Sequence, residues 1–504
     1  MSALENVLNE LKKISYLRGA EALLSWDQET YMPEGAGDAR SNQIAHISTL
    51  LHNTLVGETM SKNLGELVDL GSGKIRDESL PAREQRRLKE IWRDYHHAAA
   101  LPSEFVEEVS KHASRSQQLW VKARQANDFS MFQPSLEKTV EYKHREIEYL
   151  GKLDTPYDTL LDEFEPHMTS AKVTELFSEI RSRLVPLIQD ITAVKDRVDN
   201  SILKKDYPIE QQWDFGMSML KAMGFDMVYG RQDKSAHPFT TSTHPTDVRV
   251  TTRLMANDLK SALLSTLHEG GHGLYEQGLP GEEADNPFGE AISLGIHESQ
   301  SRLWENLVGL SRPFWAFAYP KLQEYFPESL TNVPEDDFYK AMNKVEPSLI
   351  RVEADEATYN LHIMVRYEIE KLLINENYPV AKLPELWNDK MEEYLGIRPD
   401  KDANGVLQDV HWSFGAIGYF PTYTLGNLYS AMWFNQAQQE IRDLNGKMAQ
   451  GDLLPLRDWL REKIHRHGRS KTADELVREI TGEELSAKPF LDYLEKKYQG
   501  IYGL

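Results

Sequence analysis

Residues 258–280 read Asp258-Leu-Lys-Ser-Ala-Leu-Leu-Ser-Thr-Leu-His-Glu-Gly-Gly-His-Gly-Leu-Tyr-Glu-Gln-Gly-Leu-Pro280. Asn257 or Asp258 can cap the start of a helix, because a short polar side chain accepts a hydrogen bond from a free backbone amide. Gly278 followed by Pro280 can end that helix. The leucines of the stretch supply apolar contacts. A single helix is therefore predicted here.

Within this helix, residues 268–272 read His-Glu-Gly-Gly-His. His268 and His272 are four residues apart and share one helix face, so their imidazoles can bind one metal ion. Glu269 is then placed to take a proton from a bound water, which predicts a zinc hydrolase. The alternative is a surface helix with two incidental histidines. Three glycines, at positions 270, 271 and 273, argue against it. Each weakens a helix by about 1 kcal/mol, and close approach of a backbone or a substrate would explain them.

A third metal ligand is expected downstream, because zinc hydrolases use three protein ligands and one open position. Residues 289–306 have the pattern of a second helix, reached through a loop rich in glycine and proline at 278–288. Glu298 follows His272 by 26 residues and suits a neighbouring antiparallel helix. The residues alone leave the choice open between Glu298 and three competitors, which are Glu290, His297 and Glu305.

Composition narrows the possible partners and locations. The chain has 504 residues, 40% of them hydrophobic, and a net charge of −22, which argues against binding to nucleic acid or to an anionic membrane. It has no cysteine, so disulfides and thiolate zinc sites are excluded. The N-terminus lacks a signal-peptide core, and no apolar run is long enough to span a membrane. A cytoplasmic location is therefore expected.

Helical periodicity covers most of the chain. Helices are predicted over residues 3–26, 37–54, 82–99, 103–126, 131–151, 170–197 and 208–223, with a break at 152–169, and again from 257 to the end. Residues 224–256 alternate valine, threonine and aromatic residues between proline and glycine, which predicts short strands beside the metal helix. We expect one continuous domain over 1–504, with a helical part at 1–223, a small sheet at 224–256 and a helical part at 257–504. An edge strand of that sheet could pair with an extended peptide.

Further chemistry is concentrated in two later segments. Arg351 can hold a carboxylate with two hydrogen bonds, or it can form an ion pair with Glu353, Asp355 or another acid. In the second segment, His411, Tyr419 and Tyr423 can hold the oxyanion of a tetrahedral intermediate, and the alternative for the tyrosines is aromatic packing in the core. Asp247 and Arg249 alternate on one predicted strand and can pair with each other.

Six ordered motifs resemble the carboxypeptidase Taq family of metallocarboxypeptidases over essentially the full length. They are His237-Pro-Phe239, Asp247-Val-Arg249-Val-Thr251, His268-Glu-Gly-Gly-His272, His297-Glu298-Ser-Gln300, Ile350-Arg351-Val-Glu-Ala-Asp355 and Gly405-Val-Leu-Gln-Asp409-Val-His411-Trp412. Near the N-terminus, Leu24-Ser-Trp-Asp-Gln-Glu also looks like the opening helix of the family.

The resemblance implies a mainly α fold, a large helical body with a deep active-site groove and a small β-sheet beside the metal helix, assembled as a homodimer. It implies removal of single residues from the free C-termini of peptides with broad preference. It makes Glu298 the third ligand of one divalent metal, expected to be Zn²⁺ with Co²⁺ or Mn²⁺ as alternatives, and Glu269 the general base. It makes His411 and Tyr423 candidates for holding the oxyanion. Arg351 is the candidate for holding the terminal carboxylate, and the candidates for further substrate contacts are His237, Arg249 and Tyr419.

One position departs from the wider class of such enzymes. Many of them place an aspartate four residues after the glutamate ligand, where it orients a metal-bound histidine, and this chain has Arg302 there. The nearest alternative function is an oligoendopeptidase with the same metal residues. A helical scaffold with a structural metal is a weaker alternative, because structural zinc usually fills all four positions with protein ligands.

Overall fold

Helix α10 (Leu259–Gly278) is the predicted helix, and it is present in the computed structural model, which describes residues 2–504. Asp258 caps its start, because the Asp258 side chain accepts a hydrogen bond of 3.2 Å from the backbone amide of Ser261. The helix ends at Gly278. Its buried leucines are Leu259, Leu263, Leu267 and Leu274. The helix therefore lies inside the protein and contacts neighbours on several sides.

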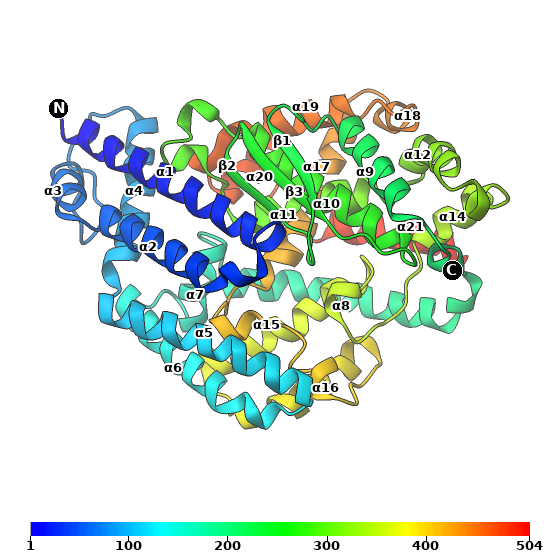
Figure 1. The fold of residues 1–504 in the computed structure, drawn as a ribbon, viewed down its shortest axis with the longest axis horizontal. Coiled ribbons are helices and arrows are strands. Elements are labelled where there is room, and N and C mark those ends of the chain that lie inside the picture. Colours follow the sequence, from blue (N-terminus) through cyan, green and yellow to red (C-terminus); the bar gives the residue numbers. More distant parts are fainter. Residues whose placement is uncertain (1) are drawn as a thin grey trace.

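A three-stranded sheet lies beside α10 (Figure 1). Its strands are β1 (Gly230–Lys234), β2 (Thr240–His244) and β3 (Asp247–Thr252), in the order β1-β3-β2. The central strand β3 runs parallel to β1 and antiparallel to β2. Val248 and Val250 of β3 are fully buried, so one face of the strand joins the core. The predicted small sheet beside the metal helix is confirmed.

The glycines of α10 lie where neighbouring elements approach it most closely. A Cβ atom added at Gly271 would lie 2.6 Å from the carbonyl oxygen of Gln300 in α11 (Leu294–Arg302). One added at Gly270 would lie 2.6 Å from Leu220 in α9 (Ile209–Met223), and one at Gly273 would lie 2.9 Å from Val250. Close packing of neighbouring elements therefore explains all three glycines.

Helix α11 starts later and ends differently from the predicted helix at 289–306. It begins after Ser293, whose hydroxyl accepts a hydrogen bond from the backbone amide of Ile296. At Leu303 it widens directly into a π-helical turn, Leu303–Val308. Such turns redirect the side chains that follow and are frequent at functional sites. Glu305 lies on this turn.

The first four helices have a hydrophobic core of their own. They are α1 (Ala3–Thr30), α2 (Gly37–Leu55), α3 (Glu58–Leu67) and α4 (Ala82–Ala100). A second and larger core joins the elements from α5 to α21. Figure 1 shows α1 and α2 crossing in front of the left half of the molecule. The prediction of one continuous domain stays a prediction.

The remaining helices surround the sheet and α10 on both sides. Figure 1 shows α5, α6, α8, α15 and α16 in the lower half and the sheet with α9 and α19 in the upper half. The helices not yet given bounds are α5 (Ser103–Ala126), α6 (Gln133–Leu150), α7 (Pro156–Phe164), α8 (Ser170–Ala193), α12 (Arg312–Tyr325), α13 (Pro327–Leu330), α14 (Glu335–Met342), α15 (Tyr359–Glu376), α16 (Leu383–Leu395), α17 (Pro421–Glu440), α18 (Leu444–Ala449), α19 (Leu454–Lys463), α20 (Ala473–Thr481) and α21 (Lys488–Tyr502). The mainly α fold is confirmed, while the deep groove stays a prediction.

Two helices lie where none was predicted. Helix α3 follows Gly57, and α7 lies inside the predicted break at 152–169. The break was wrong because Pro156 occupies the first turn of α7, where its missing N–H costs nothing. Thr155 and Asp158 also form a capping box there, in which each side chain accepts a hydrogen bond from the backbone amide of the other.

Among residues 2–504, no helix is both long enough and apolar enough to cross a lipid bilayer.

Candidate active site

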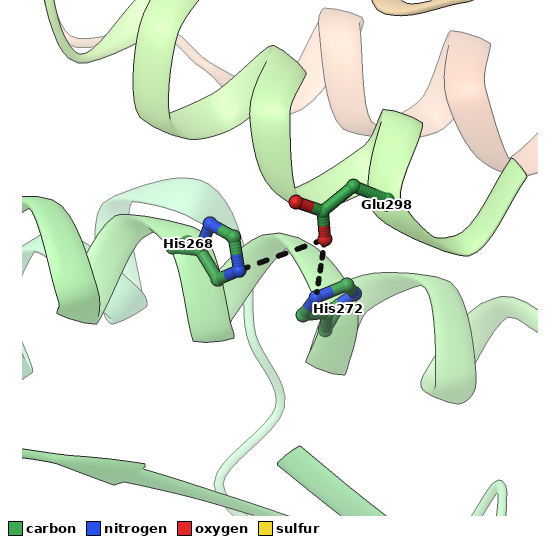
Figure 2. A group of neighbouring side chains, drawn as sticks. All are labelled: His268, His272 and Glu298. Atoms are coloured by element: carbon green, nitrogen blue, oxygen red, sulfur yellow. Dashed lines mark ion pairs between the residues drawn. The ribbon is translucent and has the colours of Figure 1, made fainter. Parts of the chain in front are cut away.

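His268 and His272 of α10 meet Glu298 of α11 (Figure 2). The Nε2 atoms of His268 and His272 lie 3.8 and 3.3 Å from the same carboxylate oxygen of Glu298, Oε2. One candidate ligand atom from each residue lies within 4.8 Å of the other two, which is the spacing of a metal site. Gly426 of α17 makes room for this carboxylate, since a Cβ atom there would lie 2.7 Å from Cγ of Glu298. Two imidazole nitrogens and one carboxylate oxygen suit a divalent metal such as zinc.

Arg302 and Glu305 fix two of these three side chains. The Nδ1 atom of His268 is hydrogen-bonded to Glu305 at 2.8 Å. Arg302 donates to Glu298 at 2.7 Å and to Glu305 at 2.8 Å. Burial acts to raise the pKa of Glu298, but Arg302 and His268 outweigh it and hold the pKa well below its usual range. Position 302 therefore supplies a cation that orders two carboxylates, and the acid that orients His268 is Glu305.

His272 is supported by a relay of two further side chains. Its Nδ1 atom lies 2.6 Å from Nδ1 of His297, and Nε2 of His297 lies 2.8 Å from Glu276. With a metal ion on Nε2 of His272, its Nδ1–H would donate to His297, which in turn would donate to Glu276. Burial, followed by the neighbouring His297, lowers the pKa of His272 to about 3, so this ring is neutral at pH 7. His297 thus lies behind a candidate ligand.

Glu269 follows His268 directly and lies against strand β2. It is 6% exposed, and burial raises the pKa of its carboxyl group. The Thr240 hydroxyl lies 2.7 Å from Oε2 of Glu269 and 3.1 Å from its carbonyl oxygen. One residue of the sheet therefore fixes the position of this carboxylate.

Arg351 lies on a 3-10 turn, Arg351–Glu353, and is 6% exposed. Its Nε and Nη2 atoms each lie 2.9 Å from Oδ1 of Asp409, and its Nη1 donates to the hydroxyl of Tyr359 at 3.0 Å. The sequence alone leaves the acid partner of Arg351 open between Glu353, Asp355 and another acid. The partner is Asp409, 58 residues further along the chain.

Tyr359 connects Arg351 to the metal-ligand group. The guanidinium carbon of Arg302 lies 4.4 Å from the centroid of the Tyr359 ring, and the Tyr359 hydroxyl accepts a hydrogen bond from Arg351. Arg302 in turn donates to Glu298. No feature of the sequence pointed to Tyr359, because it is the first residue of a long buried helix.

His411, Tyr419 and Tyr423 lie together beside Arg351. Nε2 of His411 and the hydroxyl of Tyr423 are 3.4 Å apart, and the Tyr419 ring lies within 5.4 Å of both other rings. The guanidinium carbon of Arg351 is 5.1 Å from the Tyr423 ring centroid. Burial lowers the pKa of His411 to about 4, so its ring is neutral at pH 7.

His237 and Arg249 lie on the sheet side of the site. Arg249 donates to both carboxylate oxygens of Asp247, at 2.9 and 3.0 Å, and its guanidinium carbon lies 4.4 Å from the centroid of the Trp26 ring. His237 is exposed in the loop between β1 and β2, and its carbonyl oxygen accepts a hydrogen bond from Ser235. The pairing of Asp247 with Arg249 is thus present, and the substrate roles of His237 and Arg249 stay predictions.

Comparison with known proteins places this site in a family. The model of the carboxypeptidase Taq (M32) metallopeptidase family matches residues 6–498. Thermostable carboxypeptidase 1 of Thermus thermophilus is 42% identical, covering 100% of this chain and 99% of the relative, and carboxypeptidase 1 of Bacillus subtilis is 38% identical, covering 98% and 97%.

Solved structures agree with the sequence relatives. The M32 carboxypeptidase from Deinococcus radiodurans R1 has a TM-score of 0.96 at 38% identity and covers 100% of both chains. A Pyrococcus furiosus carboxypeptidase has a TM-score of 0.94 at 37% identity, covering 99% of both. The metallocarboxypeptidase interpretation therefore holds over the oligoendopeptidase and scaffold alternatives, and the chain belongs to the carboxypeptidase Taq (M32) metallopeptidase family.

Proposed function

We propose that this enzyme removes single residues from the free C-termini of peptides, with one divalent metal held by His268, His272 and Glu298. Zinc is the proposed ion, because two imidazoles and one carboxylate form a common catalytic zinc site. Co²⁺ and Mn²⁺ are the alternatives. A homodimer and a cytoplasmic location belong to the same proposal. They rest on the family resemblance and on the absence of cysteine.

The proposed chemistry divides between a base and two hydrogen-bond donors. A divalent metal bound at the site would polarise the scissile carbonyl and lower the pKa of water to about 7. Glu269 takes the proton of the attacking water and passes it to the leaving amine, while Thr240 holds its carboxylate. Burial raises the pKa of Tyr423 well above its usual range, so its hydroxyl stays protonated and can donate to the oxyanion. Neutral His411 can donate through Nε2.

The proposed preference for free C-termini rests on one observation, which is that Arg351 has hydrogen-bond donors not used within the protein. A guanidinium has five N–H donors. Hydrogen bonds to Asp409 and Tyr359 engage one on Nε and one on Nη1, and Nη2 forms an ion pair with Asp409. One N–H remains on each terminal nitrogen, and such a pair matches the two oxygens of a carboxylate. Tyr359 joins this guanidinium to the group of metal ligands. A peptide whose terminal carboxylate is bound to Arg351 would therefore present its last amide bond to the metal site.

The test compares one peptide as the free acid and as the C-terminal amide, with Arg351→Gln as the variant. We expect the parent enzyme to release single residues in order from the free acid and to act poorly on the amide. Arg351→Gln should lower kcat/KM on the free acid by about 100-fold and barely change the rate on the amide, because a buried charge contact is lost with one substrate alone.

Arg183→Gln is the matched control. Arg183 also pairs with acids, Asp492 and Glu495, but it joins α8 to α21. Its loss should leave both rates unchanged. Equal losses on the free acid and the amide in Arg351→Gln would remove Arg351 from the proposed role. Internal cleavage of the free acid would contradict the C-terminal preference itself.

A further inference from the structure

Asp409 lies between two arginines. Its Oδ1 atom accepts a hydrogen bond from Nε of Arg351 at 2.9 Å and lies 2.9 Å from Nη2 of the same group, and its Oδ2 atom lies 2.6 Å from Nε and Nη2 of Arg366 on α15. Arg366 is fully buried, and the side chain of Asp409 is 11% exposed. One carboxylate is therefore divided between two guanidinium groups, each of which occupies a single oxygen.

The groups around this trio add little negative charge to it. His362 on α15 is fully buried, and burial with the nearby Arg366 holds its pKa well below the usual range, so it is neutral. His411 is also neutral at pH 7. Burial raises the pKa of Glu370 to about 7, which reduces its negative charge at neutral pH, and its oxygens accept hydrogen bonds from Trp412, Gly418 and Tyr157 instead of from Arg366. The two arginines therefore exceed the acid that they share by one positive charge.

Arg366 has no path to a substrate. Its Nη1 atom donates to the carbonyl oxygen of His362 at 2.7 Å, and its guanidinium carbon lies 4.5 Å from the Trp387 ring centroid and 5.6 Å from that of Phe420. It is enclosed on these sides and bonded to Asp409 on another. Asp409 is therefore the residue through which hydrogen bonds connect Arg366 to Arg351.

We infer that Arg366 is a positioning residue for recognition of the C-terminal carboxylate: by occupying one oxygen of Asp409, it prevents that acid from neutralising Arg351. The inference rests on the role of Arg351 under the proposed function. If the Arg366 cation were absent, both oxygens of Asp409 could turn to Arg351 as a bidentate pair. Asp409 would then compete with the substrate carboxylate for the same guanidinium. Two arginines on one acid fix the orientation of Arg351 and leave the three side chains with a net positive charge.

The test separates charge from volume at position 366 in the metal-loaded enzyme. Arg366→Gln removes the charge and keeps an amide donor, Arg366→Met removes both, and Arg366→Lys keeps the charge without the planar fork. For the free-acid peptide, we expect Arg366→Gln and Arg366→Met to raise KM about tenfold with kcat nearly unchanged, because weakened ground-state binding acts on KM. Arg366→Lys should restore KM to within about threefold of the parent value. The amide peptide should respond to none of the three variants.

A purely structural role for Arg366 predicts a different pattern. Arg366→Lys would then raise KM as much as Arg366→Gln does. The unfolding temperature would fall, and kcat would fall for both peptides. That pattern, or an unchanged KM in a folded Arg366→Gln or Arg366→Met enzyme, would overturn the inference. Either of these two variants is sufficient if the other does not fold. If Arg351→Gln loses the preference for free acids while folded Arg366→Gln keeps it, this inference alone fails. If Arg351→Gln affects both peptides equally, the proposed function fails.

Discussion

The metal-ligand group and the Arg351 group lie side by side but are built in different ways. His268, His272 and Glu298 lie on two regular helices, and the spacing along each helix places their side chains. Arg351 lies on a single 3-10 turn, and Asp409 lies in an irregular segment that leads to a second such turn, His411–Phe414. Helical geometry therefore orders the first group, and long-range hydrogen bonds order the second.

The same difference is visible in their ion pairs. Glu298 pairs with Arg302, one helical turn away, while Arg351 pairs with Asp409, 58 residues away. A local pair forms wherever the helix forms, whereas a distant pair requires the whole fold. Changes in the helices should therefore alter metal binding and turnover, and changes around Arg351 should alter the choice of substrate.

The largest effect is expected from Glu269→Gln, which tests the chemistry at the metal-ligand group. The amide has the size of the carboxyl group but cannot accept the proton of the attacking water. We expect kcat to fall by about 10²–10⁴-fold. Bound metal should stay at the parent level, because Glu269 is outside the ligand group. Single-turnover rates and metal analysis of the purified enzyme check both points.

Thr240→Val is the graded control for that prediction. It removes the hydroxyl that lies 2.7 Å from Glu269 but keeps the base, so a loss smaller than that of Glu269→Gln is expected. A Glu269→Gln enzyme that retains more than about a tenth of the parent rate would show that another group is the base.

The metal-ligand group was largely predictable from the sequence. Asp258 and Gly278 marked the ends of α10, and the glycines indicated the close approach of other elements. The choice of Glu298 among four candidates needed the family resemblance, because spacing alone does not say which residue of a neighbouring helix faces the metal. Glu305 could have been found as a supporting acid, since it follows Arg302 by three residues and Glu298 by seven, on one side of a helix.

The Arg351 group was not predictable in the same way. Arg351, Asp409 and His411 lie in recognisable motifs of the sequence, but their hydrogen bonds were not predictable, because no periodicity relates position 351 to position 409. Tyr359 and Arg366 lie on a helix that is buried on most sides, so no polar face distinguishes them in the sequence. The relay from His272 through His297 to Glu276 was not predicted either. In the sequence, His297 is a candidate for the third ligand, and nothing there indicates that it lies behind His272.

Gly271→Ala tests the contact between the two helices of the metal group. The added Cβ atom would lie 2.6 Å from the Gln300 carbonyl oxygen and 2.8 Å from Cα of Ser301, both of which are backbone atoms. Helices α10 and α11 must then separate, and we expect a loss of about 1–3 kcal/mol in the free energy of unfolding, together with weaker metal binding. Thermal unfolding and metal titration measure these effects.

Gly37→Ala is the control, because a Cβ atom at Gly37 in α2 would have nothing within 4 Å. That variant should be neutral or more stable by less than about 1 kcal/mol. If both variants behaved alike, close packing would not be the reason for the glycine at position 271.

Glu305→Gln should weaken metal binding without changing the choice of substrate. Glu305 orients His268 from behind, and removal of such a partner typically costs about 10–100-fold in metal affinity. His297→Gln should act similarly through His272. Competition with a chelator at fixed pH measures the affinity. The ratio of rates on free-acid and amide peptides should stay at the parent value, and a change in that ratio would contradict the separation of the two groups.

The smallest effect concerns His411 and the pH dependence of stability. Its pKa is about 4 in the folded protein, against an ordinary value of 6.5, because burial disfavours the charged ring. Arg351 and Arg366 act in the same direction, and Asp409 opposes them. Between pH 6.5 and 4 the unfolded chain binds a proton that the folded protein does not, so this contribution to stability is present above pH 6.5 and is lost as the pH falls. Between pH 7 and 5 the loss is at most about 2 kcal/mol.

His411→Gln lacks this group, so its unfolding midpoint relative to the parent should rise as the pH is lowered over that range. A difference between the two midpoints that does not change with pH would show that the folded protein accepts a proton on His411 as readily as the unfolded chain does.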